Sequence, residues 1–269
     1  MNRKKILVAA LVAALWALPV MPQEEEGTIA RVAFFRAKPE KSAQLEEGLK
    51  KHMAWHKAQN GTWGWSVWSI ETGEGTGSYG AGTFNHKWSD FDAPDVDAAA
   101  DTADSAQNIL PYMAEGAAWR YYASLPKFSR AWPQEKGPAP LAVVLVFRLR
   151  MGANEEFINA IAKIHKAIEK TKWPAYYEWY ALVNGGEHPT FVLVLPYANY
   201  AAMAPPATSF DKMLEEAFGR TEAEAIIHTF DKTVVSETSE IVRDRPDLSY
   251  RPAPAPAAPA AAAPATKPK

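Results

Sequence analysis

Two histidines of this chain stand four residues apart in a segment of helical character, and a third follows a predicted strand. His52 and His56 share one helix face, because residues i and i+4 are neighbours there. Such a pair can bind zinc or copper when a third ligand joins it. The glutamate usual between helical zinc ligands is missing, so we predict no metal site and keep both histidines as weak candidates. His86 and Glu178 are weak candidates for a catalytic base.

Three tryptophans occupy six positions of the stretch NGTWGWSVWSI, residues 60–70. Successive side chains of a strand point to opposite faces, so these tryptophans divide by parity. We expect Trp63 and Trp65 to pack beneath helices and Trp68 to face the other way. Trp68 is therefore the one of the three that could contact a ligand.

The same alternation directs two arginines toward the inner face of the predicted sheets. Arg148 needs a partner there, because an isolated buried charge is costly, and Glu178 is the available carboxylate. Arg36 has no such partner, since Ser66 occupies the position equivalent to Glu178. Arg36 is thus freer to bind an anionic or carbonyl-bearing ligand. The candidate ligand-binding residues are Arg36, Trp68, Arg148, Tyr176, Glu178 and Tyr180.

The elements that must position these residues occur as two copies of one unit. The shift that places VAFFR (32–36) on VLVFR (144–148) also places WGWSVWSI (63–70) on AYYEWYAL (175–182) without a gap. Few positions are identical, but the hydrophobic pattern is shared, which indicates an internal repeat. In this alignment His52 and His56 correspond to two isoleucines in an apolar stripe of the second copy. Both histidines are therefore expected to be buried.

Each copy has the order strand, helix, strand, strand, helix, strand, which is the ferredoxin-like arrangement. The predicted fold class is α+β, with one unit over residues 28–130, a linker over 131–140 and a second unit over 141–245. A four-stranded sheet with both helices on one face leaves its other face bare. We therefore expect the two antiparallel sheets to pack face to face as an α/β barrel within one chain.

This order and its tandem repetition, over residues 28–245, resemble the dimeric α/β-barrel superfamily, which includes antibiotic-biosynthesis-monooxygenase-like, NIPSNAP-like and EthD-like families. For an enzyme, the resemblance implies a cofactor-independent oxygenase or isomerase. Some barrels of this superfamily bind or degrade haem. Those would call for a strand asparagine where this chain has Arg36, so no cofactor is expected.

The two ends indicate export. Residues 1–22 combine three basic residues with an apolar run, as in a signal peptide, although a retained anchor is an alternative. Residues 251–269 form a Pro/Ala-rich tail that is expected to be disordered. We expect a bacterial protein that is periplasmic or secreted, with no membrane span after signal cleavage. The chain has no cysteine, so disulfides and thiolate metal sites are excluded.

Composition and fold leave three hypotheses for function. Acidic residues, 31, outnumber the 29 lysines and arginines, so the positive surface that nucleic-acid binding needs is lacking. The first hypothesis is a binder of a small aromatic or carboxylated molecule in the barrel interior, with self-association into a homo-oligomer possible. The second is the oxygenase or isomerase, and the third is a structural or interaction protein with a solid core. A cavity in the barrel would separate the first two from the third.

Overall fold

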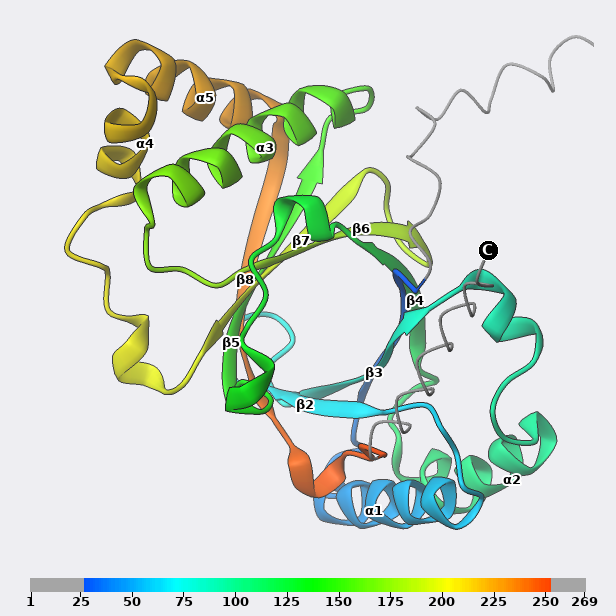
Figure 1. Cartoon of the computed structure of the whole chain (residues 1–269). Coiled ribbons are helices and arrows are strands. Elements are labelled where there is room, and N and C mark those ends of the chain that lie inside the picture. Colours follow the sequence, from blue (N-terminus) through cyan, green and yellow to red (C-terminus); the bar gives the residue numbers. More distant parts are fainter. Residues whose placement is uncertain (1–26, 253–269) are drawn as a thin grey trace, which may run out of the picture.

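The computed structural model describes residues 27–252. The predicted signal peptide (1–22) and residues 253–269 of the predicted tail lie outside this range. Within it, eight strands close into a barrel in the order β1-β3-β2-β8-β5-β7-β6-β4, with helices on the outside (Figure 1). No helix in residues 27–252 combines the length and the apolar character that crossing a bilayer requires. The predicted α+β barrel class is confirmed.

The two halves of the chain repeat the same succession of elements. The first half consists of β1 (Ile29–Arg36), α1 (Ser42–Ala58), β2 (Ser66–Ile70), β3 (Ser78–His86), α2 (Ala98–Asn108) and β4 (Ala118–Ser124). The second half consists of β5 (Leu141–Leu149), α3 (Asn154–Thr171), β6 (Glu178–Asn184), β7 (Thr190–Tyr197), α4 (Phe210–Phe218), α5 (Arg220–Thr233) and β8 (Val234–Asp244). The last helical region is divided at Gly219, where α4 ends. The φ of Gly219 is 82°, a backbone conformation that favours glycine.

The barrel closes because each sheet uses both of its edges to pair with the other sheet. Each unit has the internal order fourth, first, third, second strand, so β4 and β2 are the edges of one sheet and β8 and β6 those of the other. β2 pairs with β8, placing Trp68 opposite Asp244, and β4 pairs with β6, placing Tyr122 opposite Leu182. Within residues 27–252, closure therefore pairs both edges of each sheet.

Strand alternation sorts the side chains of β5 as the sequence predicts. Phe147 and Leu149 pack beneath α3, where Phe147 lies 6.1 Å from Phe157 between ring centroids. Val144 and Val146 point the other way, into the barrel. The apolar outer face of the second sheet thus packs against helices. This layer of contacts is the hydrophobic core of the second unit.

The helix-covered side of the first unit contains the two histidines of α1. The exposed fractions of His52 and His56 are 6% and 3%, which confirms the expected burial. Trp65 is buried beside them, as predicted, with its ring centroid 5.9 Å from that of His56. Burial lowers the pKa of His56, and the neighbouring imidazole of His52 lowers it further.

Each unit ends in a short segment that crosses to the other unit, and we call residues 125–130 and 245–250 the first and second straps. Their sequences, LPKFSR and RPDLSY, have a proline, a large apolar residue and a serine in the same places. Neither strap was predicted from the sequence. Their isolated antiparallel bridges join Arg130 to Tyr177 and Tyr250 to Trp65.

The two straps dock through equivalent contacts. The hydroxyl oxygen of Ser249 accepts a 2.9 Å hydrogen bond from the Val67 N–H, and that of Ser129 accepts one of 2.9 Å from the Trp179 N–H. Leu248 is fully buried in the core of the first unit, although it follows the last strand of the second. The straps therefore join the two units on the helix side of the sheets, beyond the strand pairing itself.

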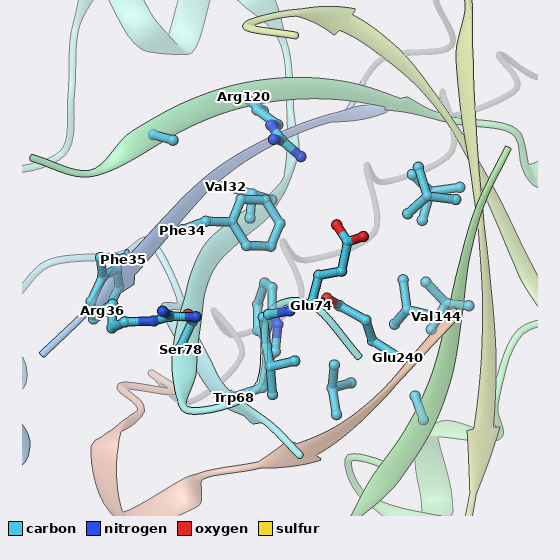
Figure 2. Close-up of a pocket in the computed structure, with 18 of the residues that line it drawn as sticks. Val32, Phe34, Phe35, Arg36, Trp68, Glu74, Ser78, Arg120, Val144 and Glu240 are labelled. Atoms are coloured by element: carbon cyan, nitrogen blue, oxygen red, sulfur yellow. Dashed lines mark hydrogen bonds between the residues drawn. The ribbon is translucent and has the colours of Figure 1, made fainter. Parts of the chain in front are cut away.

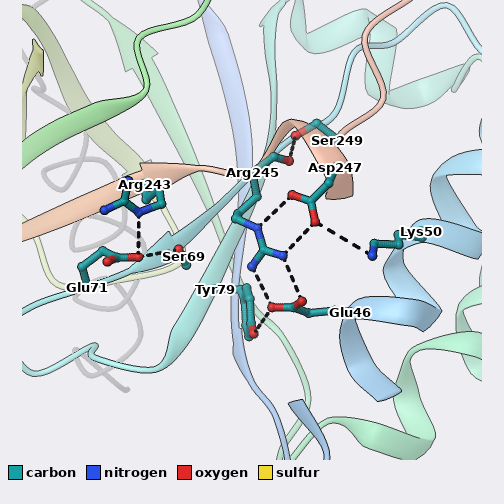
Figure 3. Close-up of polar contacts among 9 residues, drawn as sticks. All are labelled: Glu46, Lys50, Ser69, Glu71, Tyr79, Arg243, Arg245, Asp247 and Ser249. Carbon is teal, nitrogen blue, oxygen red and sulfur yellow. Dashed lines mark hydrogen bonds and ion pairs between the residues drawn. The ribbon is translucent and has the colours of Figure 1, made fainter. Parts of the chain in front are cut away.

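Arg245 ties the second strap to α1 (Figure 3). Its guanidinium donates two hydrogen bonds to the Glu46 carboxylate, at 2.7 and 2.9 Å, and further bonds to Asp247. The Tyr79 hydroxyl donates to the same Glu46 carboxylate at 2.8 Å. This bidentate geometry is the strong form of an arginine–carboxylate pair. It lowers the pKa of Glu46, with Arg245 as the largest cause.

We predict that Leu248→Ala destabilises the whole protein. Removing a fully buried leucine should lower the free energy of unfolding by about 2–5 kcal/mol, because a cavity remains in the core of the first unit. Leu110→Ala, at a leucine that is 49% exposed, is the control and should change it by less than about 0.5 kcal/mol. Urea denaturation measures both. Equal effects would show that the strap does not support the core.

The Glu46–Arg245 pair should make stability depend on pH. Because the pKa of Glu46 is lowered by folding, its contribution is present above the ordinary value of 4.5 and is lost as the pH falls through the folded value. We expect Glu46→Gln to cost about 1–3 kcal/mol at neutral pH and progressively less in acid. Glu156→Gln, which removes an exposed pair with Lys232, should cost under about 1 kcal/mol throughout. A Glu46→Gln cost that is constant with pH would contradict this assignment.

Candidate functional site

The barrel encloses a cavity of about 1090 Å³ that opens to solvent (Figure 2). Every strand contributes inward side chains to its wall. Small-molecule sites commonly have about 300–1,000 Å³, so this volume is sufficient for a ligand. The interior is therefore hollow, and the solid core of the third hypothesis is not what the structure shows.

One wall of the cavity is aromatic and the facing wall is aliphatic. Phe34 of β1 and Trp68 of β2 meet edge to face, with 6.3 Å between ring centroids. The Trp68 indole lies directly over Gly80 of β3, where an added Cβ would come within 2.2 Å of the ring. The glycine is thus required for Trp68 to lie flat on the sheet. The aliphatic wall consists of Val144, Val146, Val192 and Val194.

The mouth of the cavity carries charge of both signs. The Arg36 guanidinium donates a 3.0 Å hydrogen bond from Nε to the Ser78 hydroxyl and remains exposed. Glu240 of β8 accepts a 2.9 Å hydrogen bond from the Gly75 N–H. Figure 2 shows the Glu74 carboxylate extending toward the cavity from the neighbouring hairpin. A ligand entering here meets a cation on one side and carboxylates on the other.

Arg120 of β4 is a second cation in the cavity wall, and the sequence analysis did not identify it. Its guanidinium carbon lies 5.0 Å from the centroid of the Phe34 ring, and Figure 2 shows the group directed inward. The Nε atom is buried and has no hydrogen-bond partner among residues 27–252. Alternation in AWRYYASL could have revealed it, because Arg120 shares the inward parity with Ala118 and Tyr122.

The structure brings three of the predicted ligand-binding residues to the cavity. Arg36, Trp68 and Tyr180 line it, whereas Arg148, Tyr176 and Glu178 are not among the lining residues. Tyr176 packs instead on Trp132 of the linker, with 5.4 Å between ring centroids.

The expected ion pair between Arg148 and Glu178 does not form, which corrects the prediction. Arg148 pairs with Glu187 at 2.6 Å, and both side chains are largely exposed. The strand register explains this difference. Glu178 pairs with Val194, which in turn pairs with Val144, four residues from Arg148 along β5. Four residues of a strand span roughly 13 Å, too far for an ion pair.

Glu178 and Tyr180 interact with each other instead. The Tyr180 hydroxyl donates a 2.7 Å hydrogen bond to the Glu178 carboxylate. Burial raises the pKa of Tyr180 well above its ordinary value, and the adjacent Glu178 charge raises it further. Tyr180 is therefore a neutral hydrogen-bond donor at physiological pH, and the Glu178 carboxylate accepts its hydrogen bond.

His86, the other candidate base, lies outside the barrel cavity. Its ring packs against Trp63 at 4.3 Å and Phe91 at 5.3 Å between centroids, and its Nε2 contacts the Thr83 hydroxyl. Burial lowers the pKa of His86, although Asp90 opposes this effect. The imidazole is therefore neutral and enclosed, and it does not reach the cavity wall.

Comparisons with known proteins support the fold. No family model and no curated protein matches the chain. Candidate monooxygenases from Lactobacillus acidophilus and Fusobacterium nucleatum are similar in structure, with TM-scores of 0.51 and 0.52 and sequence identities of 13% and 16%. They align over 84% and 82% of this chain and 96% and 93% of theirs. An anthrone oxidase-like protein is similar at a TM-score of 0.51 and 11% identity, over 82% of this chain and 92% of its own.

These likenesses show the α+β barrel fold alone. At such low identity they carry no residue-level correspondence, and fold by itself does not determine activity.

The contact between Trp68 and Gly80 gives a test of the cavity wall. Gly80→Ala should cost about 1–3 kcal/mol of unfolding free energy, because the new methyl group displaces the indole. Trp68→Ala should cost less in the Gly80→Ala background than in the wild type, with a coupling of about 0.5–3 kcal/mol. Gly116→Ala, at the same cavity but with nothing within 4 Å of the added Cβ, is the control. Strictly additive effects would mean that the indole lies elsewhere.

Proposed function

We propose that this protein binds a flat, largely apolar small molecule with an anionic or carbonyl group inside its barrel. The observation that carries the proposal is the cavity of about 1090 Å³, whose wall is mostly apolar but includes the guanidinium of Arg120 beside the Phe34 ring (Figure 2). Ligand sites typically combine an apolar surface with a few polar groups that fix orientation. We further propose that the mature protein acts in the periplasm or outside the cell.

The arrangement of the walls suggests how such a ligand would lie. Its flat body would occupy the space between the Phe34 and Trp68 rings and the valines of β5 and β7. Its polar group would approach the Arg120 guanidinium, which is directed into the cavity (Figure 2). Arg36 at the mouth would attract a negative charge before entry. A hydrogen bond to a charged group such as a guanidinium is stronger than one between neutral groups, so this contact would contribute to affinity.

An oxygenase or isomerase acting in the same cavity is the alternative. The shared fold with candidate monooxygenases is compatible with it. A proton-transfer step would need a base that faces the ligand. His86 lies outside the cavity, and Glu178 accepts a hydrogen bond from Tyr180. We therefore favour binding, and turnover of a bound compound would instead support the alternative.

Fluorescence of anilinonaphthalene sulfonate, a flat aromatic anion, tests the proposal. We expect saturable binding that is strongly weakened by Val144→Trp, which places a bulky indole in the cavity opposite the aromatic wall, and weakened about tenfold or more by Arg120→Leu, which removes a charged donor. Arg36→Leu should weaken binding less, because Arg36 is exposed at the mouth.

Arg148→Leu is the matched control. Arg148 is the repeat equivalent of Arg36 but does not line the cavity, so its removal should leave binding unchanged. Binding that is insensitive to Val144→Trp, in a variant shown by circular dichroism to be folded, would refute the interior site. Native mass spectrometry of the purified protein should in addition show a bound compound that Val144→Trp eliminates.

A further inference from the structure

A second group of polar side chains converges outside the barrel, between α1 and α2. His52 and His56 come from consecutive turns of α1, and Asp101 comes from the facing helix. The Oδ1 atom of Asp101 lies 3.3 Å from Nε2 of His52 and 3.5 Å from Nε2 of His56. One ligand atom from each residue lies within 4.8 Å of the others. None of the three lines the barrel cavity.

The hydrogen bonds around His52 determine which of its nitrogens carries a proton. Its Nδ1 lies 2.8 Å from Oδ1 of Asp104, and an ionised carboxylate can only accept. Nδ1 is therefore the donor, and in the neutral ring Nε2 carries a lone pair. That lone pair faces the Asp101 carboxylate, which is also an acceptor. The Ser105 hydroxyl, 3.4 Å from Nε2, offers only a long hydrogen bond.

The Asp101 oxygen between the two imidazoles forms a hydrogen bond with neither Nε2 atom. Its Oδ1 atom is buried and has no hydrogen-bond partner within residues 27–252. A buried acceptor without a partner is unfavourable, and two acceptors that face each other repel. A cation placed between them would satisfy both.

We propose that His52, His56 and Asp101 bind a divalent transition-metal ion, with zinc as the best match. Tetrahedral zinc has Zn–N and Zn–O distances of about 2.0–2.2 Å, which place neighbouring ligand atoms about 3.3–3.5 Å apart. The two nitrogen–oxygen distances lie in that range. Asp104 would orient His52 through Nδ1, the usual role of a carboxylate behind a ligating histidine.

The site has an enclosed side and an open side. His52 stacks on Trp55 at 5.9 Å and His56 on Tyr250 at 6.5 Å between centroids, so aromatic rings surround the imidazoles. Asp101 is partly exposed, with 36% of its side chain accessible. Three protein ligands leave a fourth tetrahedral position for water or a small exogenous ligand, as in zinc sites that bind substrates.

Comparison of the two units indicates that packing does not require these histidines. The aligned positions in α3 are Ile164 and Ile168, and Ile168 is buried in an apolar core. The first unit thus has imidazoles where the same fold accepts isoleucine. The helices that present the ligands are also held close together, since a Cβ at Gly48 would lie within 1.8 Å of the Asn108 carbonyl.

Titration of the untagged full chain, first treated with a chelator, tests the proposal. We expect calorimetry to show a single equivalent of bound Zn²⁺, and Co²⁺ to give the visible absorption of a tetrahedral site. His56→Ile and Asp101→Asn should each abolish both signals. Asp104→Asn should lower the affinity for Zn²⁺ by about 10–100-fold, because it removes the group that orients His52.

His165→Gln is the control for adventitious binding, because His165 bonds to Tyr177 on the other unit and should leave both signals intact. His56→Ile should remain folded, with a melting temperature that no longer rises on addition of Zn²⁺. Absence of Zn²⁺ binding to the wild type, or binding that His56→Ile and Asp101→Asn leave unchanged, would overturn the proposal. The barrel-binding experiment is independent of either result, since the two sites share no residue.

Discussion

The structure depends on the reciprocal pairing of two four-stranded sheets at both edges. A single ferredoxin-like sheet has helices on one face, a bare second face and two open edges. Pairing β2 with β8 and β4 with β6 closes both edges of each sheet and turns the two bare faces toward each other. The straps likewise connect the two units on the helix side of the sheets. Leu248 follows the last strand of the second unit and completes the core of the first. Neither unit is complete without the other.

Closure also explains why the barrel is hollow. Eight strands give an interior just wide enough to be filled by side chains or to hold one small ligand. Here the aliphatic wall consists largely of valines, and β3 contributes Gly80 and Gly82, so the inward side chains do not meet at the centre. Gly80 in addition lets Trp68 lie against the sheet. The short side chains of the valine wall thus leave space in front of the aromatic wall of the closed barrel.

The two units perform different tasks with one architecture. The helix side of the second unit is apolar, with Phe157 and Ile161 fully enclosed. The corresponding side of the first unit contains buried histidines that face the carboxylates of Asp101 and Asp104. Both cavity arginines, at positions 36 and 120, also belong to the first unit. The second unit thus has the more regular apolar packing, and the first contains both arginines of the proposed ligand site.

The sequence by itself determined the features that depend on local periodicity. The repeat predicted the element order and the barrel class, and alternation correctly separated the inward Val144 from the outward Phe147. The alignment with isoleucines predicted the burial of His52 and His56, because homologous positions of a repeat share their environment. About half of the proposed ligand-binding residues also reached the cavity.

What the tertiary structure decided is the pairing of residues that are distant in sequence. Hairpin register separates Arg148 from Glu178, although both have inward parity. The packing of α2 on α1 brings Asp101 to the two histidines, and no spacing along the chain indicates that contact. Period and parity describe one element at a time, whereas register and helix packing are set by the fit of whole surfaces, and that fit exists only in the folded chain.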